Sequence, residues 1–163
     1  MYRRNIKILL AVLTGSLALV YVLQNFANID AAHQSVVYVM SGNDHLAYTN
    51  TLFFKTENPM LAWIAVVAIC LGELSAGLLL LYGASRMWAN RNNSAEDFAD
   101  SLKFAEIGAA VGVLVWLGFF GVIGAAFFQM WQTAIGDGSM RGAFQFFVTC
   151  GFTLLYLNVA NSE

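Results

Sequence analysis

Glu73 is the residue of this chain whose type and position could most directly do chemistry. It lies near the middle of an otherwise apolar run at residues 60–82. An ionisable side chain inside a membrane segment is costly, usually faces the interior of a helix bundle, and often marks an ion or substrate path. Two interpretations follow. Glu73 is either a proton-coupling group of a small transporter or a structural hydrogen-bonding group, which links helices of the bundle or pairs with another protein in the membrane.

Three further residues lie at a depth similar to that of Glu73. A helix rises about 1.5 Å per residue, and counting from the ends of the apolar segments places Ser16, Trp116 and Thr149 near the same level. We therefore expect Glu73, Trp116, Ser16 and Thr149 to form one intramembrane polar layer, either structural or proton-coupling. In this layer an indole N–H or a hydroxyl would donate a hydrogen bond to the carboxyl group.

The two histidines of the chain are the other candidates for chemistry. His33 and His45 lie near Asp30 and Asp44, but their spacing matches no standard set of metal ligands. A metal site normally has three or four ligands with supporting hydrogen bonds, so we expect both histidines to pack in a loop and no metal to bind. No nucleophile elbow, phosphate loop, CxxC or HExxH motif is present. We therefore expect a protein that is not an enzyme and needs no cofactor.

The composition shows which elements must position these residues. Of the 163 residues, 59% are hydrophobic and 11% are charged, whereas about a quarter are charged in soluble proteins. A helix that crosses a bilayer needs roughly 20 mostly apolar residues. Four segments qualify, at residues 8–26, 60–82, 107–131 and 142–160. The sequence therefore predicts an all-α membrane protein, a single domain over residues 1–163 built as a bundle of four transmembrane helices.

The distribution of basic residues predicts the orientation of the bundle. Six of the eight basic residues precede the first segment or flank the loop at residues 83–106, and these are Arg3, Arg4, Lys7, Arg86, Arg91 and Lys103. By the positive-inside rule, both chain ends and loop 83–106 face the cytoplasm, and loop 27–59 lies outside. No cleavage site follows the first segment, so we expect a retained anchor. No basic stripe suggests a nucleic-acid partner.

The outer loop contains two segments with the composition of strands. Residues 35–40 (SVVYVM) and 49–54 (TNTLFF) flank the turn-forming residues 41–44. This pattern predicts a short β-hairpin that caps the outer end of the bundle. A two-stranded hairpin is only marginally stable by itself. We therefore expect the hairpin to lean on the helix ends or on a partner protein.

Small residues in the third segment predict close helix packing. They are Gly108, Gly112, Gly121 and Ala125. Small side chains let helix backbones approach each other closely within a membrane. Cys70 and Cys150 also lie inside apolar segments, where free cysteines usually act as small hydrophobic residues. We expect them to pack in the bundle rather than to form a disulfide.

The closing third of the chain resembles a known bacterial family. Residues 124–133 (GAAFFQMWQT), Asp137-Gly138 and residues 143–146 (AFQF) are similar to the closing signature of the "predicted small integral membrane protein" group. That group is a domain of unknown function with about this length and number of spans. The resemblance implies the same topology and a location in the bacterial inner membrane. It implies no activity, since the family has none assigned.

Together these features favour a non-enzymatic membrane subunit or scaffold. The helix faces are rich in small residues, the soluble segments are short, and the outer loop needs a surface to lean on. We expect the chain to associate with itself or with a larger complex of the inner membrane. The alternatives are a small proton-coupled transporter that uses Glu73 and a channel formed by an oligomeric ring.

Overall fold

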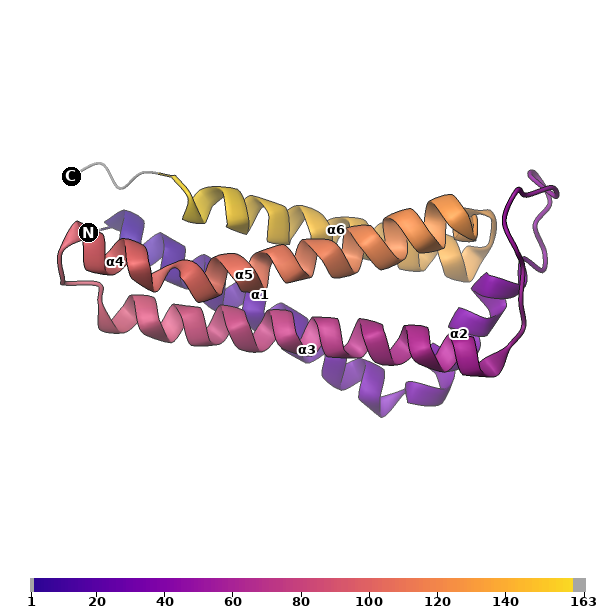
Figure 1. Ribbon diagram of the computed structural model, residues 1–163, viewed down its shortest axis with the longest axis horizontal. Coiled ribbons are helices and arrows are strands. Elements are labelled where there is room, and N and C mark those ends of the chain that lie inside the picture. Colours follow the sequence, from indigo (N-terminus) through magenta and orange to yellow (C-terminus); the bar gives the residue numbers. More distant parts are fainter. Residues whose placement is uncertain (1, 160–163) are drawn as a thin grey trace.

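The computed structural model describes residues 2–159, and every regular element within that range is a helix. The long helices lie side by side, and the first helix begins at the same end of the bundle at which the last helix ends (Figure 1). We name this the termini end and the opposite one the loop end. Three helical segments are long and apolar enough to cross a membrane: Tyr2–Ala27, Pro59–Ala89 and Ala95–Phe127. The chain is therefore an all-α integral membrane protein.

Helices α1 (Tyr2–Ala27) and α3 (Pro59–Ala89) form the most extensive helix pair. The start of α3 is set by Asn58, whose side-chain oxygen accepts a hydrogen bond from the Met60 amide at 2.9 Å, and by Pro59 at the first helical position. Both residue types are favoured at these positions, because the first amides of a helix have no partner within it. With 31 residues, α3 is about 46 Å long and places Glu73 close to its centre.

The third apolar segment is a helix in three parts: α4 (Ala95–Ser101), α5 (Lys103–Val113) and the π-helix η1 (Leu114–Phe127). The Ser94 hydroxyl caps α4 by accepting a hydrogen bond from the Asp97 amide at 3.1 Å. In η1 the backbone bonds to the fifth residue along instead of the fourth, as in the 2.9 Å bond from the Phe128 amide to the Ile123 carbonyl. The resulting turns are wider than those of an α-helix.

The last helix, α6 (Ala134–Leu157), follows the short 3-10 turn η2 (Met130–Gln132) and packs along α5 and η1. Thr133 caps α6 by accepting a hydrogen bond from the Gly136 amide at 3.1 Å. The predicted fourth segment is thus a helix of the bundle. By length and composition, however, three helices and not four qualify as membrane spans in the described range.

The predicted β-hairpin is wrong, because residues 35–40 lie within helix α2 (Ile29–Ser41) and no strand occurs in residues 2–159. The chain turns at Asn28 and α2 ends at Gly42, whose φ of +63° favours glycine and closes the helix. Val36 and Met40 of α2 pack against α3 and η1 side chains. This packing outweighs the strand preference of the β-branched residues, which depends strongly on context.

The loop at residues 42–58 leans on helix ends of the same chain. Phe53 stacks on Phe127 with ring centroids 4.2 Å apart, and Tyr48 meets Trp131 edge to face at 5.4 Å. The Gln132 side-chain oxygen accepts hydrogen bonds from the amides of Ala47 (3.0 Å) and Tyr48 (2.9 Å). The loop therefore packs on η1 and η2 of its own chain, as expected of a segment that is only marginally stable by itself.

Basic residues of α1 join the two ends of the chain. The buried Lys7 ammonium donates hydrogen bonds to the carbonyls of Leu157 and Val159, each at 2.7 Å. A cation at this place also complements the negative end of the α6 dipole. Arg4 similarly donates to the backbone carbonyls of Arg91 (3.0 Å) and Asn93 (2.8 Å). Residues that sequence reasoning used only to orient the bundle therefore also hold helix ends together.

The apolar core is largest at the termini end. The cluster at the termini end contains ten buried residues: Ile8, Ala11, Leu80, Ala84, Met87, Phe98, Leu102, Ala105, Ala109 and Leu157. The cluster at the loop end contains only Met40, Ala62 and Phe128. Fewer buried apolar residues therefore pack together where α2, α3 and η1 meet than at the termini end.

Candidate functional site

Glu73 is buried inside the bundle and bound to a single neutral partner. Only 2% of its surface is exposed. The Asn25 side-chain amide of α1 donates a hydrogen bond to Glu73 Oε2 at 2.8 Å, which joins α1 to α3. Among the described residues this is the only hydrogen bond to the carboxyl group, and no basic side chain forms an ion pair with it. The geometry is that of an interhelical hydrogen-bonded link.

The other members of the predicted polar layer do not bind Glu73. Trp116 is buried, but its ring stacks on Phe146 with centroids 4.7 Å apart. Ser16 is exposed on α1. Thr149 is exposed on α6 and donates to the Gln145 carbonyl of its own helix at 2.8 Å. The structure thus places Trp116 in the core and the two hydroxyl residues on the surface.

Asn25 and a second polar pair were missed by sequence reasoning. Asn25 lies near the end of the predicted segment 8–26, and a side-chain amide there can donate a hydrogen bond to a buried carboxyl group. Thr14 of α1 and Thr153 of α6 are both buried, and their hydroxyl oxygens lie 2.9 Å apart. Among the described residues, the hydrogen bonds that join side chains of two different helices are therefore Asn25–Glu73 and Thr14–Thr153.

The predicted packing residues of the third segment divide into two groups. A β-carbon at Gly108 would crowd the backbone of Leu80 on α3, and one at Gly112 would crowd the Cys150 sulfur on α6. Gly121 has only Leu117 of its own helix nearby, and Ala125 is half-buried. The first two residues therefore serve contacts between helices, whereas no such contact is seen at Gly121.

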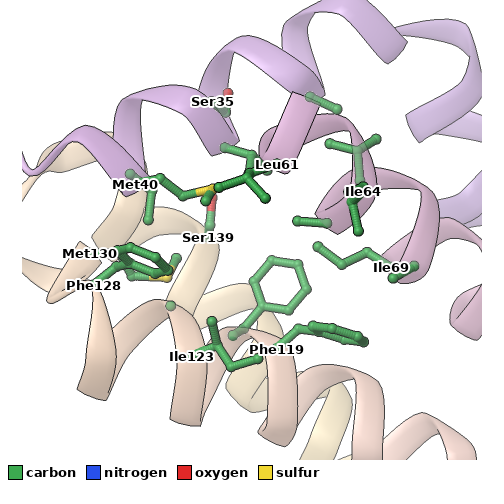
Figure 2. Close-up of a pocket in the computed structure, with 18 of the residues that line it drawn as sticks. Ser35, Met40, Leu61, Ile64, Ile69, Phe119, Ile123, Phe128, Met130 and Ser139 are labelled. Carbon is green, nitrogen blue, oxygen red and sulfur yellow. The ribbon is translucent and has the colours of Figure 1, made fainter. Parts of the chain in front are cut away.

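A cavity of about 510 Å³ opens between α2, α3, η1 and the start of α6. Figure 2 shows the side chains of Leu61, Ile64, Phe119 and Ile123 pointing into it from α3 and η1. Its size lies in the range typical of sites for small ligands. Asn25 also lines the cavity, so one wall of the cavity lies beside the Asn25–Glu73 bond.

The cavity presents few free polar groups. Ser35 and Ser139 line it, but their hydroxyls already donate to the carbonyls of Ala31 and Ile135 within their own helices, at 2.8 and 2.9 Å. The Asn25 amide is engaged by Glu73. The space is therefore suited to an apolar guest and poorly suited to a charged one.

The two histidines lie in different surroundings. His33 Nε2 is 3.0 Å from the Pro59 carbonyl, and its ring stacks on Trp63. His45 is only 8% exposed, and neither ring nitrogen has a hydrogen-bond partner within the described residues. Burial and the nearby Lys55 lower the pKa of His45, and Asp44 opposes this shift. Within residues 2–159, no three His, Cys, Asp or Glu side chains gather as a metal site.

No curated protein matches the chain, and neither does a solved structure. A family model does match it, over residues 3–160. The chain thus belongs to the family described as "Predicted small integral membrane protein (DUF2165)".

Proposed function

We propose that this protein is a non-enzymatic subunit or scaffold of the bacterial inner membrane, which assembles with itself or with a larger complex through one face of α6. The observation that carries the proposal is a row of small and polar residues on that face. Gly138, Gly142, Gln145 and Thr149 follow one another at helical spacing. Residues at such spacing share one side of a helix.

This face has room for a second helix. A β-carbon built at Gly138 or Gly142 would meet no atom within 4 Å. Pairs of small residues four positions apart allow two membrane helices to approach closely. The Gln145 side chain is exposed, and it makes no hydrogen bond within the described residues. A glutamine amide both donates and accepts, so the same residue in a second copy would be a complete partner.

The proposal treats α6 as a fourth membrane span. With 24 residues, α6 is about 36 Å long, enough to cross a hydrocarbon core of about 30 Å. Gln145 would then lie roughly 16 Å from the start of the helix, near the middle of the membrane. An amide facing lipid there lacks the hydrogen bonds it would have in water, which favours association.

The topology that we propose has both termini and loop 83–106 in the cytoplasm. It is supported by the clustering of basic residues at the termini end. A single cysteine at the exposed Asn92 tests it, because the native Cys70 and Cys150 are buried and should react slowly. If Asn92→Cys reacted with an impermeant thiol reagent only from the periplasmic side, the proposed orientation would be wrong, and loop 83–106 would face the periplasm.

Native mass spectrometry of gently solubilised membranes tests the assembly. We expect a dimer or larger complex, and we expect Gly142→Leu or Gln145→Leu to reduce it. Gly118→Leu is the matched control, because Gly118 on η1 also has no atom within 4 Å of its β-carbon position. A strictly monomeric wild-type protein, or equal loss of the complex in the control, would refute the proposal.

A small proton-coupled transporter is the second candidate. It is favoured by one observation, namely that the cavity is lined by the same Asn25 amide that holds Glu73. A guest that moved Asn25 would change the surroundings of the carboxyl group. Under this hypothesis Glu73→Gln abolishes proton-dependent flux in reconstituted vesicles, since an amide cannot bind and release a proton. Unchanged flux in that variant would exclude this role.

A further inference from the structure

We propose that the cavity between α2, α3, η1 and α6 binds one acyl chain of a phospholipid from the membrane leaflet at the loop end. A cavity of about 510 Å³ is much larger than the few small voids of a normal protein interior. Its walls lose dispersion contacts if it stays empty. An occupant that restores these contacts is therefore expected, and this argument does not depend on assembly through α6.

The chemistry of the lining favours an apolar occupant over water. A buried water typically makes about three hydrogen bonds to protein groups that would otherwise lack a partner. Here the hydroxyls of Ser35 and Ser139 bond their own helices, and the Asn25 amide donates to Glu73. The remaining lining is almost wholly aliphatic, aromatic or thioether. A hydrocarbon guest fits such walls, and it has no hydrogen bonds to lose.

The position of the cavity matches one leaflet. On α3 its lining runs from Leu61 to Cys70, a rise of about 14 Å. Half of a typical hydrocarbon core is about 15 Å thick. The lining ends close to Glu73, at the centre of α3. The cavity therefore reaches from the loop end to the middle of the helix, the depth that one acyl chain occupies.

The cavity also opens toward lipid. Ile64 of α3 is 59% exposed and Ile123 of η1 is 43% exposed, although both line the cavity. A chain from the surrounding bilayer can therefore enter between these helices without crossing water.

A lysine follows the loop residue that lines the loop end of the cavity, and its side chain packs beside Gly42. Phe54 lines the cavity, and the next residue, Lys55, is the only lysine or arginine of loop 42–58. The Lys55 ammonium makes one long hydrogen bond, 3.4 Å to the Thr49 carbonyl, and no ion pair in the described range. The loop also holds Asp44, which accepts from Tyr38, and Glu57, which accepts from Asn43, and neither acid forms an ion pair with Lys55. The charge of Lys55 is thus available to a lipid phosphate.

Lipid titration with the purified full chain tests the site. The protein is delipidated in detergent, and native mass spectrometry then measures binding of phosphatidylglycerol and, separately, of palmitate. We expect one tightly bound phospholipid per chain and weaker binding of the free fatty acid. Ala65→Phe, which fills the cavity, should lower phospholipid binding at least about tenfold. Val67→Phe, on the exposed face of the same helix, should leave it unchanged.

A second measurement on the wild-type protein covers the case in which Ala65→Phe does not fold. A phospholipid with a diazirine near the end of its acyl chain should label Ile69 or Phe119 inside the cavity more than the exposed Leu114.

Lys55→Gln should weaken phosphatidylglycerol binding several-fold and leave palmitate binding less affected. Equal binding by Ala65→Phe and wild type, tighter binding of palmitate than of phospholipid, or labelling confined to Leu114 would overturn the proposal.

Discussion

The contact between Asn25 and Glu73 predicts a specific pattern of stability in single and double variants. If the carboxyl group serves as a link between α1 and α3, Glu73→Gln should be nearly silent, because the amide keeps an oxygen that accepts from Asn25. Glu73→Leu should weaken the bundle, because the Asn25 amide then loses its partner. Asn25→Leu should be the more damaging change, since it leaves a carboxyl group that is 2% exposed without a partner.

The magnitudes follow from one hydrogen bond of 2.8 Å between buried groups. Hydrogen bonds between membrane helices contribute about 0.6 kcal/mol on average and at most about 2 kcal/mol. We therefore expect a coupling free energy of about 1 kcal/mol between the two positions. Leaving one buried polar group unsatisfied costs roughly 1–3 kcal/mol. Asn25→Leu should thus cost about 2 kcal/mol, and the double variant should cost less than the sum of the single variants.

A double-mutant cycle measured by reversible unfolding in mixed micelles gives these quantities directly. Ser75→Ala is a suitable control on α3, because its hydroxyl is exposed and bonds only the Leu71 carbonyl of its own helix. A coupling energy near zero, or a Gln variant as unstable as the Leu variant, would refute the reading of Glu73 as a structural link.

Three further predictions concern the ends of the bundle, the helix contacts and the loop. Lys7→Met should lower the unfolding free energy by about 2–4 kcal/mol, because two hydrogen bonds to a charged group disappear. Thermal unfolding measures this loss. Lys103 is exposed, so the control variant Lys103→Met should change the unfolding free energy little. Gly83→Ala should cost about 1–3 kcal/mol in the same assay, because its β-carbon would collide with the Ala105 backbone, whereas Gly138→Ala should not destabilise. The pKa of His45 is lowered in the folded loop, so the open loop binds a proton more readily. The folded loop should therefore be most stable above about pH 6.5 and lose stability as the pH falls below that value. Proteolysis within residues 46–54 should rise in this range and should become independent of pH in His45→Phe.

The sequence predicted the long helices well and their faces poorly. Apolar stretches of 20 residues indicate membrane helices because the bilayer requires that length. Counting residues gives depth along a helix, but each residue also rotates the side chain by about 100°. Thr14 and Gly15 therefore face the core, whereas Ser16 is exposed. For this reason Ser16 and Thr149 do not lie beside Glu73 as the expected polar layer required. Two side chains at the same depth meet only if they also face each other.

The loop end was harder to predict because its conformation depends on distant contacts. Residues 35–40 have the composition of a strand, yet Val36 and Met40 find apolar partners on α3 and η1 only when the segment is helical. The cavity depends on how far α2 and η1 diverge from α3, which no local pattern encodes. Likewise, the unpartnered ring of His45 follows from how the loop folds over Phe127 and Phe128.

The contact of Lys7 with the carbonyl of Leu157 joins residues 150 positions apart and sets an order of events during synthesis. At roughly 5–20 residues per second, about 8 to 30 s separate the appearance of these two residues. During that interval α1 and α3 can already pair, because both are complete, while the lysine at the start of the chain has no helix end to bind. Packing of α6 against the other helices is therefore the step that completes the bundle. A ribosome stalled before that helix would leave α1, α3 and α5 with one side open to any chaperone or insertase in the membrane.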